Sequence, residues 1–183
     1  MSQNRDHGLL FVPPSTQDHR QGVLNATVVL VLYGNYQCAQ SANVYELIQD
    51  IQQQVSVSLG EHYLCFIFRH FPQSQIHTQA QRAAEAAEAA AAQGQFWQMH
   101  STLFEHQQAL ASGYLVEYAN NLGLDICQFL QAMFKHLYLD RINKDIESGL
   151  QSGVTTAPAL FINDTRYSDR WHIEQLMAAI TTE

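Results

Sequence analysis

The chain has 183 residues, enough for one domain or for one domain that carries a sizeable insertion. Apolar residues make up 46% of it and charged residues only 14%, which excludes wholesale disorder. The net charge of −8 argues against nucleic acid or an anionic membrane as the main partner. The longest apolar runs, Val28–Tyr33 and Leu64–Phe68, are too short to span a bilayer, and no signal-peptide pattern follows Gly8–Val12. We therefore expect a soluble cytoplasmic protein without membrane insertion.

The N-terminal part is predicted to contain a polar arm, then a buried strand, a helix and a second buried strand. Residues 1–26 are polar and contain two adjacent prolines, so we expect an arm that wraps the surface. Thr27–Tyr33 is a continuous run rich in β-branched residues, typical of a strand buried on both faces. Apolar residues at helical spacing predict a helix that begins at about Cys38, and Tyr63–Arg69 predicts the second strand. The connection is long enough for a right-handed parallel crossover.

The segment from residue 77 to residue 149 has helical patterns and no strand signal. It opens with the alanine-rich stretch Gln79–Gln93, which strongly favours a helix. Asp125 is predicted to cap the last long helix, which ends near Gly149 or Gly153. That helix is expected to be lined by four apolar residues, Leu130, Met133, Phe134 and Leu137.

Strand patterns return at the C-terminal end. We expect strands over Ala159–Ile162 and Thr165–Ser168, joined by a hairpin, and a closing helix over His172–Ile180. The fold class is therefore α/β, with the order β-α-β, a helical block, then β-β-α. The predicted organisation is an arm over 1–26, a core over 27–76 and 150–183, and a helical insertion over 77–149.

Cys38 stands where a buried strand gives way to a helix. A thiol at that point faces unpaired N–H groups and the positive end of the helix dipole, which favour the thiolate. The alternative interpretation is a small apolar residue that fills a turn. Pro158 lies directly before a predicted strand, and the sequence leaves its peptide isomer open. Because α/β sheets place ligands where strands end, Cys38 is the candidate reactive residue.

These residues and several other segments resemble DsbA-like thioredoxin-fold proteins. The resemblance spans about residues 15–180 and is nearest in pattern to the cytosolic type of this domain, also found fused behind some sodium/proton antiporters. It implies a thioredoxin fold, and a cis peptide bond between Ala157 and Pro158 that lies against Cys38. The matching segments are Tyr33–Cys38, Arg69–Pro72, Ala83–Glu88, Phe96–His100, Leu122–Asp125 and Gly153–Asn163.

Two departures from the family pattern shape the expected chemistry. The second active-site cysteine of the family is replaced by Ser41, and Ala157 stands where threonine or valine is usual. A serine can hydrogen-bond a thiolate at Cys38, but it cannot attack a mixed disulfide. The resemblance therefore implies a monothiol thiol–disulfide oxidoreductase with catalytic Cys38 and Ser41 and no bound cofactor. Its substrate-binding residues would be Tyr36, Gln37, Ala157 and Pro158.

The expected partners are protein or small-molecule disulfides and thiols, with glutathione or another external thiol resolving the mixed disulfide. A redox-silent module that binds extended peptide beside Pro158 is one alternative. A glutathione transferase similar to the kappa class, which uses a serine near this location, is another. Thiol reactivity distinguishes the first two functions, and activity on an electrophilic substrate distinguishes the third.

The remaining cysteines, histidines and acids are expected to be structural. Cys65 lies in mid-strand and Cys127 just inside a helix cap, and both are predicted to be core residues. The nine histidines are scattered and show no metal-ligand spacing, so we expect no metal site. Glu85 and Glu88 are three residues apart in the alanine-rich stretch, and we expect them on a solvated helix face.

Overall fold

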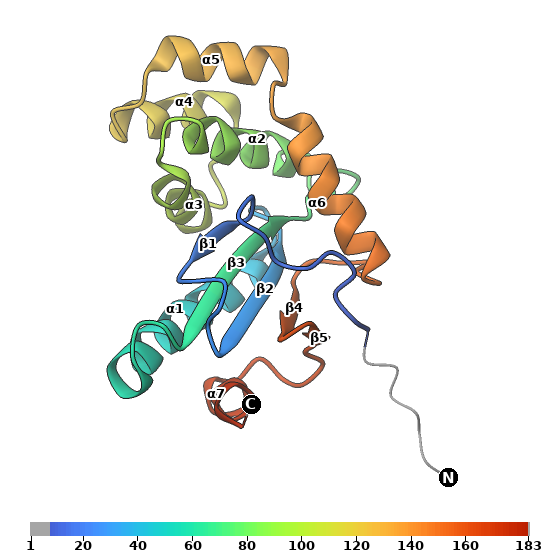
Figure 1. Cartoon of the computed structure of the whole chain (residues 1–183). Helices are drawn as coiled ribbons and strands as arrows, with labels where there is room; N and C mark the ends of the chain where they lie inside the picture. The colour runs from blue at the N-terminus through green and yellow to red at the C-terminus, as the bar shows by residue number, and fades with distance from the viewer. Residues whose placement is uncertain (1–7, 183) are drawn as a thin grey trace.

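The protein is built around a five-stranded mixed sheet (Figure 1), described here by a computed structural model over residues 8–182. The strand order is β1-β3-β2-β4-β5, and the central strands β2 (Val28–Gly34) and β3 (Leu64–His70) are parallel. Helix α1 (Ala39–Leu59) joins them, as predicted. Strands β4 (Ala159–Ile162) and β5 (Thr165–Arg166) add an antiparallel hairpin beside β2.

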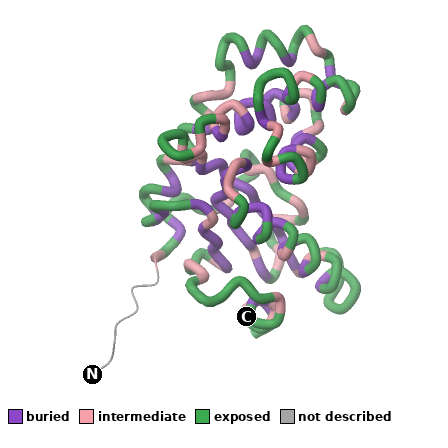
Figure 2. Tube along the Cα trace, turned by 180° about the vertical axis from the view of Figure 1, so that it is seen from behind, coloured by how far each residue is buried: buried purple, intermediate pink, exposed green. Residues whose placement is uncertain are grey.

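The central strands are buried on both faces, which is why their sequences are continuous apolar runs. Alternate residues of β2 enter different cores: Leu30 and Leu32 pack on the side of α1 and α7 (Ile173–Thr181), whereas Val31 and Tyr33 pack on the opposite side. Figure 2 shows this burial running through the strands and the inward faces of the helices. The β-α-β and β-β-α halves of the predicted fold are confirmed.

Five helices lie between these halves. The first four form a layer at one end of the sheet, and the fifth leads the chain from that layer back to the sheet (Figure 1). No strand lies between residues 80 and 147, as the sequence predicted. The last helix of the group contacts β3, so the helical layer and the sheet share one core. The five are α2 (Ala80–Ala91), α3 (Phe96–Glu105), α4 (Ser112–Asn121), α5 (Ile126–Lys135) and α6 (Leu139–Gln151).

The predicted long helix after Asp125 is wrong in its extent. The Asp125 side chain does accept a hydrogen bond from the Gln128 N–H group, as a helix cap should. However, His136 adopts a left-handed conformation with φ of 51°, which ends α5 and lets α6 start in a new direction. Of the apolar residues expected to line one helix, only Met133 is buried, and Phe134 is 85% exposed.

The sequence analysis also missed β1 (His19–Gln21), which pairs antiparallel with β3. The strand has three residues, all polar, so it carries no hydrophobic pattern. It forms because the edge of β3 offers unpaired backbone groups to the preceding chain. The predicted arm thus adds an edge strand to the sheet, and residues 1–7 of that arm lie outside the described residues.

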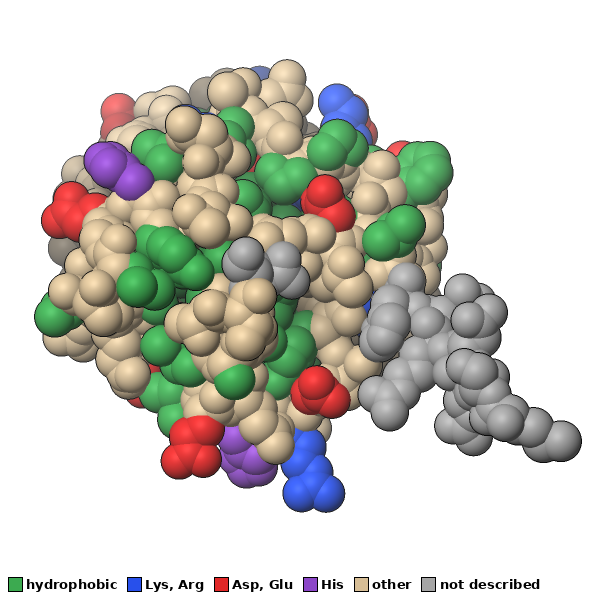
Figure 3. Space-filling view, turned by 60° about the horizontal axis from the view of Figure 1, so that its bottom comes forward, with side chains coloured by type: hydrophobic (Ala, Val, Ile, Leu, Met, Phe, Trp, Pro, Cys, Tyr) green, Lys and Arg blue, Asp and Glu red, His purple; other side chains and the backbone are tan. Residues whose placement is uncertain are grey.

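Few charged side chains are visible on the face of the molecule that holds α7 (Figure 3), in keeping with the 14% of charged residues. None of the helices described over residues 8–182 is both long and apolar enough to cross a membrane.

Candidate active site

Cys38 lies at the turn that joins β2 to α1, and it is the N-cap residue of that helix. β2 ends at Gly34, where a Cβ atom would come within 2.4 Å of the Phe68 ring, so this turn requires glycine. The Cys38 N–H group donates to the Asn35 carbonyl at 3.0 Å, which closes the turn. The strand-to-helix junction thereby holds a partly exposed thiol at the start of a 21-residue helix.

The loop before β4 meets this thiol, although it is more than a hundred residues away in the sequence. The Ala157–Pro158 peptide bond is cis. The Cys38 Sγ atom lies 3.6 Å from the Ala157 carbonyl oxygen, within reach of a weak S–H hydrogen bond. The structure therefore brings together three of the predicted site residues, Cys38, Ala157 and Pro158.

Two glutamines that the sequence analysis did not single out hold both loops in place. Gln107 donates from Nε2 to the carbonyl oxygens of Tyr36, at 2.7 Å, and Cys38, at 2.9 Å. Gln73 accepts a hydrogen bond from the Ala157 N–H group at 3.2 Å. Nothing in the sequence distinguishes these two residues from the other twenty of the chain's 22 glutamines, because their role depends on the loops that they meet.

Replacing Gln107 with alanine is expected to destabilise the protein by about 1–2 kcal/mol, because the Tyr36 carbonyl loses the amide donor and the Cys38 carbonyl keeps only the Ala42 N–H group. The neighbouring exposed Gln108 provides the control, since its replacement should change stability by less than about 0.5 kcal/mol. Urea denaturation of both variants measures the difference. Equal stability of the two variants would show that the turn does not depend on Gln107.

The side chain of Tyr36, one of the predicted substrate-binding residues, is buried. It is 1% exposed and lies in an aromatic cluster, with its hydroxyl 2.7 Å from Nδ1 of His100. Burial raises the pKa of Tyr36 and lowers that of His100, so a neutral phenol donates to a neutral imidazole. The Tyr36 side chain therefore does not reach the surface, and the substrate role of Tyr36 stays a prediction. Gln37 is half-buried, and its side-chain oxygen accepts a hydrogen bond from the Gln79 N–H group before α2.

Ser41 is fully buried one turn into α1. Its Oγ atom accepts a hydrogen bond from the Asn35 N–H group at 3.2 Å. Among the described residues, the hydroxyl makes no hydrogen bond to Cys38, so the predicted contact with the thiol is absent. Ser41 instead braces the turn from which Cys38 projects.

The other two cysteines are poor candidates for a resolving thiol. Cys65 is buried in the middle of β3, as predicted, and burial raises the pKa of its thiol. Cys127 is exposed in the first turn of α5, so the expectation that it is a core residue is wrong. All three cysteines are free thiols.

This sheet, with a cysteine at the start of α1 and a cis-proline before β4, defines the thioredoxin class of fold. A family model described as Thioredoxin matches residues 15–182, and the chain belongs to that family. The chain is 33% identical to a Na(+)/H(+) antiporter NhaA of Salinispora arenicola over 94% of its own length and 26% of the antiporter. It is 34% identical to an antiporter of the same name from Mycolicibacterium vanbaalenii, over 90% of its own length and 26% of the antiporter. The chain thus spans about a quarter of the length of the curated relatives it matches.

Solved structures share the fold across nearly the whole chain. BdbD from Bacillus subtilis aligns with a TM-score of 0.79 and 19% identity, covering 96% of both chains. The alpha-DsbA1 protein of Wolbachia pipientis aligns with a TM-score of 0.78 and 17% identity, covering 92% of both. A thioredoxin-like oxidoreductase from Silicibacter pomeroyi aligns with a TM-score of 0.77 and 19% identity, also covering 92% of both chains. The predicted thioredoxin fold with a helical insertion, and its likeness to DsbA proteins, are confirmed.

Proposed function

We propose that this protein is a DsbA-like thiol–disulfide oxidoreductase that acts through the single thiol of Cys38. The observation that carries the proposal is the position of that thiol, half-exposed at the start of α1 and 3.6 Å from the carbonyl oxygen of the cis-proline loop. Backbone N–H groups at a helix N-terminus stabilise a thiolate, which is the nucleophile in disulfide exchange.

The proposed reaction has two exchange steps. In the first, the Cys38 thiolate attacks one sulfur of a disulfide, the S–S bond breaks, and the other sulfur leaves as a thiolate. In the second, an external thiolate such as that of glutathione attacks the mixed disulfide and releases Cys38. Ser41 cannot perform this second step, because a hydroxyl does not undergo thiol–disulfide exchange. The burial of Cys65 argues against it as a substitute.

The two alternative functions are less well supported. A peptide-binding module would pair an extended peptide with the free backbone groups beside Pro158. The Ala157 N–H group already donates to Gln73, and its carbonyl oxygen already faces the Cys38 thiol. A glutathione transferase would need Ser41 to reach the glutathione sulfur, but Ser41 is fully buried.

Cytoplasmic thiol chemistry is part of the proposal. Three free cysteines without a disulfide suit a reducing compartment, where glutathione is abundant. The proposed partners are therefore glutathionylated proteins or small disulfides, and glutathione is a co-substrate that does not stay bound.

Glutathione disulfide provides a direct test. We expect one glutathione adduct to form on Cys38 faster than on Cys127, and reduced glutathione to remove it. Cys127 is a matched control because it too lies in the first turn of a helix, but the carboxylate that caps this helix, Asp125, repels the anionic reagent. Peptide mass spectrometry over time measures both rates. A Cys38 adduct that forms no faster than the Cys127 adduct would contradict the proposal.

A further inference from the structure

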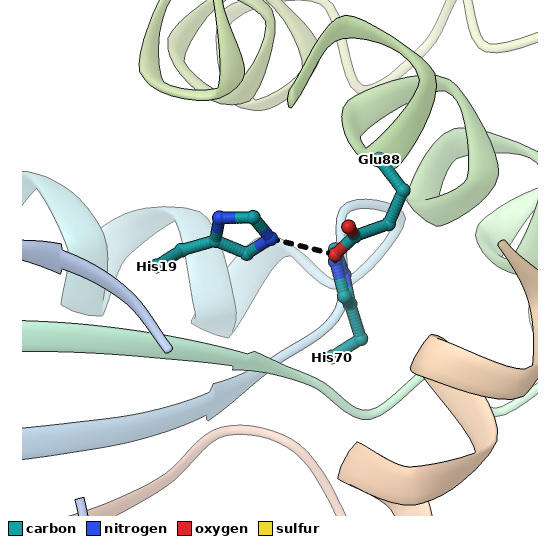
Figure 4. A group of neighbouring side chains, drawn as sticks. All are labelled: His19, His70 and Glu88. Atoms are coloured by element: carbon teal, nitrogen blue, oxygen red, sulfur yellow. Dashed lines mark hydrogen bonds and ion pairs between the residues drawn. The ribbon is translucent and has the colours of Figure 1, made fainter. Parts of the chain in front are cut away.

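Three side chains from distant parts of the chain meet between the sheet and the helical layer (Figure 4): His19 from β1, His70 from the end of β3 and Glu88 from α2. The Nε2 atoms of His19 and His70 lie 2.7 Å and 2.8 Å from the same Glu88 oxygen, Oε1. One ligand atom from each residue lies within 4.8 Å of the other two. The three groups therefore converge on one point.

This arrangement corrects two expectations from the sequence. Two of the histidines do lie close enough to Glu88 to share a metal ion with it. No local spacing could show this, because His19 and His70 lie 69 and 18 residues from Glu88 in the sequence. Glu85 and Glu88, expected on a solvated face, are 2% and 5% exposed.

The surroundings hold the three side chains in place and leave His19 partly exposed. His70 and Glu88 are buried, whereas the His19 side chain is 17% exposed. The His19 ring stacks on Phe96 with centroids 3.5 Å apart, which fixes the orientation of its Nε2 atom. An Asp145 oxygen accepts a hydrogen bond from the His70 N–H group of the backbone, which fixes the end of β3.

We propose that His19, His70 and Glu88 bind a divalent transition-metal ion, with Zn²⁺ as the best match. Two imidazole nitrogens and one carboxylate oxygen suit zinc, whereas Ca²⁺ and Mg²⁺ prefer sites made wholly of oxygen. Bond lengths of about 2.0–2.1 Å in a tetrahedral site require ligand atoms about 3.3 Å apart, so small side-chain movements would open the hydrogen-bonded group around an ion. The ring protons would move from Nε2 to Nδ1. The exposed side of His19 leaves the fourth position to water.

Helix α2, which carries Glu88, also carries a second buried glutamate that serves as a control. The Glu85 carboxylate lies 2.7 Å from Nδ1 of His136 and 3.4 Å from the Arg82 guanidinium. This carboxylate has one imidazole instead of two, and a fixed positive charge beside it disfavours a cation. Replacing His136 should therefore leave metal binding unchanged.

The test uses the untagged full chain with its cysteines alkylated and its metals removed by a chelator, because thiols also bind zinc. Titration calorimetry should show one Zn²⁺ bound per chain, and Zn²⁺ should raise the melting temperature. His19→Gln should weaken binding at least about tenfold and remove the thermal shift. His136→Gln should bind as the wild type does. No binding, or equal binding by His19→Gln, would overturn the site.

A measurement on the wild-type chain guards against a variant that fails to fold. X-ray absorption at the zinc edge should show two imidazole ligands in the zinc-loaded protein. A coordination sphere of oxygen atoms alone would overturn the proposal. The site shares no residue with the thiol site, so its failure would leave the proposed exchange reaction of Cys38 intact.

Discussion

Ser41→Cys is expected to convert the proposed monothiol exchanger into a dithiol exchanger. The new thiol would lie one helical turn from Cys38 and could attack the mixed disulfide from within the same molecule. Because intramolecular attack raises the effective concentration of the resolving thiol, insulin reduction in the presence of dithiothreitol should rise at least about tenfold. The wild type should stall at the mixed disulfide until an external thiol arrives.

The buried position of Ser41 makes the substitution informative. In the wild type, the Ser41 Oγ atom accepts a hydrogen bond from the Asn35 N–H group. Because a thiol is a weaker acceptor, we expect Ser41→Cys to lose about 1 kcal/mol in stability. Cys38→Ser/Ser41→Cys is the control and should be inactive, because it lacks the attacking thiol. If Ser41→Cys forms no disulfide with Cys38 under mild oxidation, the turn does not have the geometry of a dithiol site.

Asp18→Asn is expected to cost about 3 kcal/mol, because it leaves a buried guanidinium without its counter-ion. Asp18 accepts hydrogen bonds from Arg69 at 2.8 Å and 3.1 Å, and Arg69 is 2% exposed. Arg69 also donates to the carbonyl oxygen of Val12 and to the hydroxyl of Tyr33. The pair thus fastens the N-terminal segment to β3. Urea denaturation at neutral pH measures the loss.

The ion pair of Asp18 and Arg69 also makes the stability of the protein depend on pH in the acidic range. Burial by itself would raise the pKa of Asp18, but the hydrogen bonds and charge of Arg69 outweigh it and lower the pKa below the ordinary 3.8. A carboxyl group whose pKa is lower in the folded than in the unfolded state stabilises the fold. This contribution is complete when the pH is above the pKa of the unfolded state, and it is lost as the pH falls through the pKa of the folded state. Burial also opposes ionisation of Glu88, yet hydrogen bonds from His19 and His70 lower its pKa, so it acts in the same window.

Asp18→Asn should therefore lose less stability than the wild type between pH 5 and about pH 3. Asp50, exposed on α1, is the matched control: Asp50→Asn should keep the neutral stability of the wild type within about 0.5 kcal/mol, and its acid dependence too. An unchanged acid dependence in Asp18→Asn would show that the ion pair does not contribute.

The sequence by itself determined the frame of the protein and the position of its thiol. The runs of β2 and β3 predict strands buried on both faces, and the apolar stripe of α1 predicts the helix between them, because these patterns are local. The glycine, the turn and Cys38 follow one another directly in the sequence. The junction of strand and helix, where we propose the thiol exchange, could therefore be located from the sequence.

The tertiary structure alone decided what surrounds that thiol and which polar groups are buried. The alanine side chains of α2 are small, so its neighbours can approach closely from several directions, and Glu85 and Glu88 become buried with them. A helical pattern shows which residues share a face, but it cannot show that several faces are covered. The contacts of Gln73 with Ala157 and of His19 with Glu88 join residues far apart in the chain, and they form only when the helical layer packs on the end of the sheet.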